Sequence, residues 1–68
     1  MRTLSNIDEI EAEVNNGKTV YCGNKSYKVI KYKSTGDMYI VCDFNNYMIG
    51  LYGKDRNKLN GDNFFVVD

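Results

Sequence analysis

Apolar residues recur every three or four positions near the N-terminus of this chain. On a helix they would form one apolar stripe, made of Leu4, Ile7, Ile10 and Val14. Two capping registers remain open, Ser5 with Asp8 and Asn6 with Glu9, and Gly17 suits a left-handed stop. A helix of about eleven residues is marginal alone, so the pattern predicts an N-terminal helix docked on another layer.

Alternation of polar and apolar positions then replaces the helical period. The segments KTVYC and KSYKVIKY flank Gly23 and Asn24, a pair compatible with a type II′ hairpin turn. Counting outward from this turn places Val20 opposite Tyr27, with Cys22 on the same face. The pattern predicts a two-stranded hairpin directly after the helix.

A second hairpin is predicted from MYIVCDF and YMIGLY, joined by the Asn45–Asn46 pair in a type I′ turn. This turn would place Ile49 opposite Cys42 and Leu51 opposite Ile40. Both strands then share one apolar face, which we predict to be the core face under the helix. Its members would be Met38, Ile40, Cys42, Phe44, Tyr47, Ile49 and Leu51.

The remaining chain is a polar, turn-rich segment over residues 53–63, with Leu59 as its expected anchor, followed by the short apolar run FFVV. That run predicts a last strand that completes the pairing or covers an edge of the sheet. The prediction is an α+β fold with a single N-terminal helix packed on a four- to five-stranded antiparallel β-meander. At 68 residues, the whole chain, 1–68, is expected to form one small domain.

Charge and targeting signals limit the partners and the cellular compartment that we expect for this chain. The formal net charge is zero, which disfavours wholesale capture of nucleic acid or of an anionic membrane. No apolar run approaches the roughly 20 residues needed to span a bilayer, and the N-terminus lacks a signal-peptide pattern. We therefore expect a cytoplasmic protein, in which Cys22 and Cys42 are free thiols, with a single disulfide as the alternative.

The chain offers little catalytic chemistry. It has no histidine, which is the commonest general base and a frequent metal ligand. Its two cysteines lack the CxxC spacing of zinc sites, and no glycine-rich phosphate loop is present. We expect a protein that is not an enzyme and that holds no metal or cofactor.

The face opposite the predicted core is the candidate site. Tyrosine supplies a large contact area at low entropic cost, and one helix can cover only one side of a small sheet, which would leave an apolar patch open. The alternative is that these are ordinary cross-strand tyrosines. The candidate partner-binding residues are Tyr21, Lys28, Tyr32, Tyr39, Met48 and Tyr52.

Two other functions remain open at this point. Single-stranded nucleic acid could stack on the tyrosines and meet Lys25, Lys28, Lys31 and Lys33, although the chain has only two arginines and no RNP-type motif. Alternatively, the open face could pair with a second copy in a homodimer. We expect a protein partner first, and nucleic acid second.

Four stretches carry a resemblance that covers most of the chain. They are the spacing IxEIxxxVxxGKxVY from Ile7 to Tyr21, then NKSYKVI, YIVCDFNNYMIGL and LNGDNFF. In these stretches the chain resembles small proteins encoded by phage and prophage genomes. The resemblance implies an accessory protein acting in the cytoplasm of a bacterial host, where it would inhibit or modulate a host or defence macromolecule by covering its surface.

Overall fold

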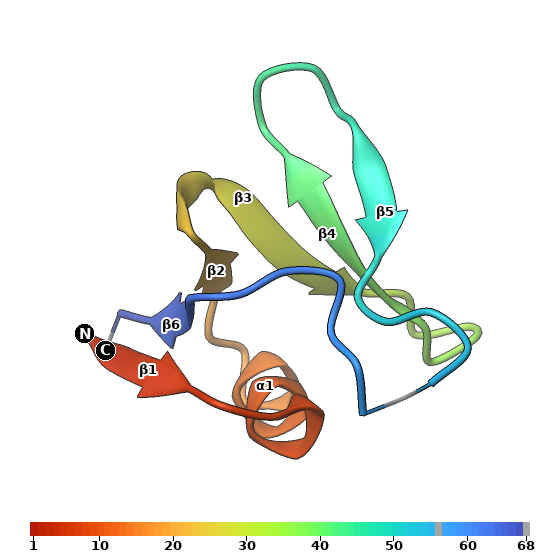
Figure 1. The fold of residues 1–68 in the computed structure, drawn as a ribbon, viewed down its shortest axis with the longest axis horizontal. Coiled ribbons are helices and arrows are strands. Elements are labelled where there is room, and N and C mark those ends of the chain that lie inside the picture. The colour runs from red at the N-terminus through yellow and green to blue at the C-terminus, as the bar shows by residue number, and fades with distance from the viewer. Residues whose placement is uncertain (56, 68) are drawn as a thin grey trace.

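A computed structural model describes residues 1–55 and 57–67 of the chain. Within them, one helix and six strands follow in the order β1(Arg2–Leu4), α1(Ile7–Asn15), β2(Val20–Cys22), β3(Asn24–Lys31), β4(Met38–Cys42), β5(Met48–Gly50) and β6(Phe64–Val66). The six strands form a single antiparallel sheet (Figure 1). The α+β prediction is thereby supported, with six strands in the described residues instead of four to five.

The order of strands across the sheet is β1-β6-β2-β3-β4-β5. Strands β2 to β5 form the predicted meander. Strand β6 does not cover an edge; it lies between β1 and β2 and pairs with both. The added strand is β1, where Leu4 is buried as part of the sheet instead of starting the helix. The edges of the sheet are therefore β1 and β5.

The helix begins in the second of the two capping registers. Asn6 is extended, and its Oδ1 accepts a hydrogen bond from the Glu9 backbone N–H at 2.9 Å. Glu9 Oε1 in turn accepts from the Ser5 backbone N–H at 2.9 Å. At the other end, Gly17 has a φ of 80°, the left-handed stop that the sequence predicted.

The first hairpin has the predicted faces but a different register. Val20 lies opposite Val29 instead of Tyr27, and the ladder shifts between Tyr21 and Cys22. A two-residue shift keeps every side chain on its face because strands alternate with a period of two. Val20 and Val29 are both buried, so the core face of this hairpin is as predicted.

The second hairpin ends sooner than predicted. Ile49 lies opposite Ile40, and β4 ends at Cys42, so residues 43–47 form a longer loop. Cys42 N–H still donates to the Tyr47 carbonyl at 2.8 Å. Beyond that bond the predicted core positions Phe44 and Tyr47 are 88% and 62% exposed. Their assignment to the core is wrong, because the sheet does not extend far enough to bring them over the helix.

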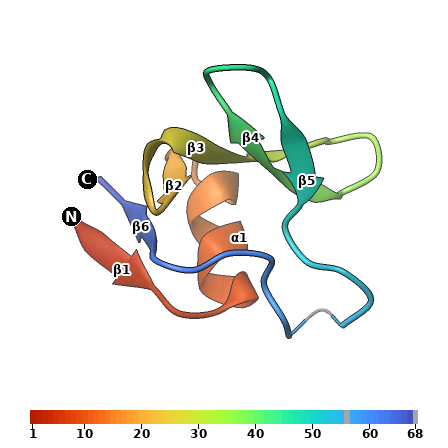
Figure 2. The same cartoon turned by 45° about the horizontal axis from the view of Figure 1, so that its top comes forward.

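The core follows one row of residues across five strands, in the order Val66, Val20, Val29, Ile40 and Ile49. The sheet curls around α1, as Figure 2 shows. Ile7 and Ile10 of the helix belong to the same buried cluster as the sheet residues, and the predicted anchor Leu59 packs against it, half-buried. No helix in the described part of the chain is long and apolar enough to cross a membrane.

Candidate binding surface

The side of the sheet that faces away from α1 carries its own row of side chains. Because side chains alternate along a strand, the neighbours of the core row point outward. Pairing between adjacent strands aligns six of these outward residues across the whole sheet, in the order Thr3, Phe65, Tyr21, Lys28, Val41 and Met48. Together with Ile30, Tyr32 and Tyr39, this row is called the open face below.

Aromatic contacts organise the open face into two groups. The rings of Tyr21 and Phe65 are stacked, with their centroids 5.4 Å apart. The rings of Tyr32 and Tyr39 lie 5.2 Å apart in a tilted arrangement, and the Tyr32 hydroxyl donates to Met48 Sδ at 3.6 Å. The contacts restrict the rings before any partner arrives, which lowers the entropy that binding would cost.

Lys28 stands between the two aromatic groups. It lies opposite Tyr21 on one side and Val41 on the other, and its Nζ is 3.2 Å from Asp43 Oδ1. Both side chains of this pair are about half exposed, so the pair contributes little to stability. It does neutralise the only charged residue of the open face.

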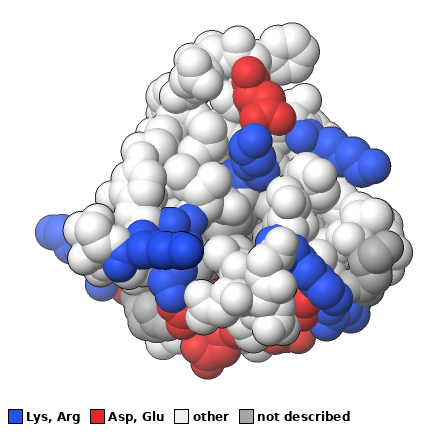
Figure 3. All heavy atoms as spheres, turned by 180° about the vertical axis from the view of Figure 1, so that it is seen from behind, with Lys and Arg blue, Asp and Glu red and all other residues white. Residues whose placement is uncertain are grey.

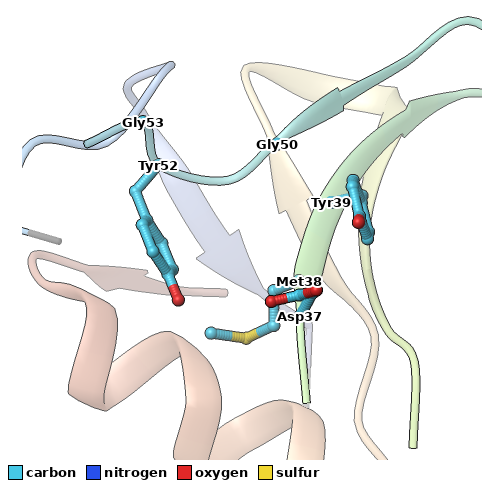
Figure 4. Close-up of a pocket in the computed structure, with 6 residues that line it drawn as sticks. All are labelled: Asp37, Met38, Tyr39, Gly50, Tyr52 and Gly53. Atoms are coloured by element: carbon cyan, nitrogen blue, oxygen red, sulfur yellow. The ribbon is translucent and has the colours of Figure 1, made fainter. Parts of the chain in front are cut away.

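Tyr52 does not belong to the open face. It is paired with Leu59 in an isolated bridge and packs against the core. In Figure 4 the Tyr52 ring and the Met38 side chain point to the same side, and the Tyr39 ring lies apart from them. The regular strand ends at Gly50, and the alternation that placed Tyr52 with Tyr39 does not continue past that end.

The six residues drawn in Figure 4 line a hollow at the β4–β5 end of the sheet. Its volume is about 280 Å³. Its polar side chains are the carboxylate of Asp37 and the phenols of Tyr39 and Tyr52. Asp37 and Tyr39 can hydrogen-bond a partner at the rim of the open face.

The lysines of the first hairpin are divided between the two sides of the sheet. Lys28 is on the open face, whereas Lys31 reaches the helix, where its Nζ lies 3.0 Å from Asn15 Oδ1 and 3.4 Å from Glu11 Oε2. Figure 3 shows basic side chains in separate places on an otherwise largely uncharged surface, with acidic side chains mainly along the bottom, where α1 lies. The structure thus forms no continuous lysine strip along β3.

Glu13 is the one buried acid of the helix, and its setting is structural. Arg2 Nη2 donates to Glu13 Oε2 at 2.8 Å, and Lys18 Nζ lies 3.7 Å from Oε1. The Arg2 contact ties strand β1 to the helix. The sequence did not predict this contact, because nothing in the local pattern indicated a strand before the helix.

Both cysteines are free thiols, as predicted. Burial is the main cause that raises the pKa of Cys22, although its Sγ donates to the Asp62 carbonyl at 3.3 Å. A raised pKa lowers the thiolate fraction near neutral pH, which makes the thiol a poor nucleophile. In the described parts of the chain, no three His, Cys, Asp or Glu residues are placed to hold a metal ion.

Sequence reasoning missed Phe65 as a member of the open face. The run FFVV showed that one of its two phenylalanines would point outward, but the neighbour of that strand was unknown, so Phe65 could not be placed beside Tyr21.

Comparisons with protein-family models, curated proteins and solved structures find no match to this chain. The geometry of its own residues therefore carries the functional argument.

Proposed function

We propose that this chain is a small non-enzymatic binding protein that docks on a larger protein through its open face. The supporting observation is the uncovered row of Phe65, Tyr21, Lys28, Val41 and Met48 on the side of the sheet without a helix. A contiguous apolar and aromatic surface on a small domain is typical of an interaction site.

The composition of this surface suits protein contact. Tyrosine and methionine are enriched in protein interfaces, where charged residues are depleted from the centre. Met48 and Tyr32 are 41% and 43% exposed, so each still has a large area to bury. The ion pair of Lys28 and Asp43 would sit among them as the polar element that fixes the orientation of the partner.

The partner class follows from the resemblance to phage and prophage proteins. We propose a bacterial host or defence protein as the target, inhibited or modulated in the cytoplasm when the open face covers part of its surface. This identity rests on the resemblance alone, whereas the choice of the open face rests on geometry.

The nucleic-acid alternative has weaker support. Stacked aromatic rings could hold bases, but Lys28 and Lys31 already have acidic partners within the chain. Binding that depends on released counterions needs basic groups that are free to meet phosphates. The protein partner is therefore the better proposal.

The test compares two tyrosine variants that differ only in where the ring lies. Crosslinking with mass spectrometry in a bacterial host would identify the partner, and calorimetry with the purified partner would give its affinity. We expect Tyr39→Ala to weaken binding at least tenfold, as the loss of a buried interface tyrosine commonly does. The control is Tyr47→Ala, which removes an exposed tyrosine at the β4–β5 loop, away from the open face.

Equal binding by Tyr39→Ala, Tyr47→Ala and the original chain would reject the open face as the docking site, provided that circular dichroism shows both variants folded. A titration with single- and double-stranded oligonucleotides covers the alternative. Micromolar binding that weakens steeply with salt would favour nucleic acid and contradict the proposal.

A further inference from the structure

The loop between β4 and β5 presents an aromatic residue to solvent in a fixed position. Phe44 is 88% exposed, an unusual state for a side chain that buries so much apolar area. The loop is held by its own hydrogen bonds: Asn46 N–H donates to the Cys42 carbonyl at 3.0 Å, and Tyr47 N–H donates to Asn45 Oδ1 at 2.9 Å. Phe44 is therefore displayed by an ordered turn, ready to insert into a cavity.

Such a cavity exists on the other side of the same hairpin from the open face. It measures about 240 Å³, and Tyr27, Ile40 and Ile49 supply its apolar wall. Polar residues also line it, namely Asn24, Asn60 and Asp62. A cavity of about 150 Å³ lined by apolar side chains is large enough to bind benzene. The phenyl ring of a phenylalanine would therefore fit, and burying it would remove apolar area from water on both surfaces.

The ring and the cavity lie close together on one hairpin. Tyr27, in the cavity wall, lies opposite Cys42, two positions before Phe44. Yet Phe44 of the same chain is not in the cavity, as its exposure shows. A chain that carries an exposed aromatic ring and a cavity of suitable size on the same patch can bury the ring and fill the cavity at a two-fold symmetric interface with a second copy.

We infer that a second copy of this chain binds here, each copy inserting Phe44 into the cavity of the other. Charge permits this occupant, because residues 44–53 contain no charged side chain and Asp62 is the one charged residue among the described residues that line the cavity. Asp43, next to the ring, is paired with Lys28. Two such patches bring together few like charges, whereas an anionic lipid surface would need free basic groups around the ring.

Sedimentation equilibrium over a concentration series tests this dimer. We expect the original chain to self-associate and Phe44→Ser to weaken the association at least tenfold. Phe44→Leu, which still fills the cavity with an apolar group, should lose less than Phe44→Ser. Tyr32→Ala is the matched control on the open face and should leave the association constant within twofold.

A mixing experiment tests the reciprocal exchange. Tyr27→Glu places a charge in the cavity wall and leaves Phe44 intact, so this variant alone should also be monomeric. When it is mixed with Phe44→Ser, one ring can still enter one unaltered cavity, and a heterodimer of intermediate affinity should form. Tyr27→Ser takes the place of Tyr27→Glu if circular dichroism shows that the latter does not fold.

A chain that stays monomeric at millimolar concentration overturns this inference, as does a dimer that survives Phe44→Ser or a mixture that forms no heterodimer. Loss of the dimer in Tyr32→Ala would place the contact on the open face instead. Results confined to Phe44 and Tyr27 leave the docking test with Tyr39→Ala unaffected, because that test uses a different surface and a different partner.

Discussion

Among the glycines of the chain, Gly61 has the tightest surroundings, next to Cys22. A Cβ added at Gly61 would come within 2.8 Å of Cys22 Sγ, and within 3.5 and 3.6 Å of Ile40 and Phe64. The last two distances are ordinary contacts, so the thiol is the only atom that must move. Sγ has little freedom to do so because Cys22 is half-buried in the sheet and donates to the Asp62 carbonyl.

Gly61→Ala should therefore destabilise the fold by about 1–3 kcal/mol, as overpacking does. The expected cost in a Cys22→Ala background is less than half of that, because the clashing sulfur is gone. Urea unfolding of the four proteins in this cycle measures both values. Equal costs in the two backgrounds would show that something other than the thiol makes glycine necessary at this position.

Local chemistry at the residue scale could be predicted where the partner is close in sequence. The two capping registers of the helix were both visible, and the left-handed glycine after it was correct. Nothing local predicted the contact of Gly61 with Cys22, or that of Arg2 with Glu13, because each joins segments that only the folded sheet brings together.

At the scale of the elements, the start of α1 shows which of two candidate N-cap residues, Ser5 or Asn6, caps the helix. Asn6 Oδ1 satisfies the Glu9 N–H, whereas Ser5 offers only its backbone N–H to the Glu9 carboxylate. The capping bond therefore depends on the Asn6 side chain, and the Ser5 side chain is dispensable.

Asn6→Ala should lower the free energy of unfolding by about 1 kcal/mol, the usual loss for a removed N-cap. Ser5→Ala should leave it within about 0.5 kcal/mol, as surface substitutions do. Thermal unfolding followed by circular dichroism at the helix band distinguishes the two. A larger loss in Ser5→Ala would mean that the competing register, with Asp8, operates in solution.

The hairpins show why strand faces are easier to predict than strand pairing. Both registers differ from the prediction, yet Val20, Ile40 and Ile49 still face the helix, because hydrophobic alternation fixes the face. The turn fixes the register, and the loop over residues 43–47 is longer than the two-residue turn that Asn45–Asn46 suggested. The error placed Phe44 in the core and hid its exposure.

At the scale of the whole molecule, the buried side and the open side of the sheet differ in how much they contribute to the stability of the fold. Ile40 is 5% exposed and part of the core row. Its chain neighbour Val41 is half-buried on the open face. The two residues lie in the same strand with similar side chains, so they form a matched pair for weighing the two sides of the sheet.

Ile40→Ala should cost about 2–5 kcal/mol, the range for a truncated core side chain. In a domain this small, that loss approaches the whole stability. Val41→Ala should cost about 1 kcal/mol or less, because the removed methyl groups leave no closed cavity. Chemical denaturation monitored by tyrosine fluorescence measures both, and similar costs would mean that the open face is covered in solution.

Strand pairing between segments that are distant in sequence limited the prediction of the candidate site. Tyr21, Lys28, Tyr39 and Met48 are together on the open face because each lies on a strand of the meander, whose neighbours follow in sequence. Tyr32 lies one residue past the end of β3 and contacts the Tyr39 ring. Tyr52 falls beyond the end of a strand, and Phe65 comes from a strand whose neighbours are distant in sequence. Pairing between distant segments carries no local pattern, so neither placement could be predicted.

The position of β6 makes completion of the sheet depend on a strand far in sequence from its neighbours. Strand β6 follows all the other strands described, yet it bridges β1 and β2 in the interior of the sheet. Without residues 64–66, β1 has no neighbour and the helix lacks Phe64 and Val66 beneath it. A chain shortened to end before Phe64 should therefore stay sensitive to proteases, and protease resistance should appear only when β6 is present to pair.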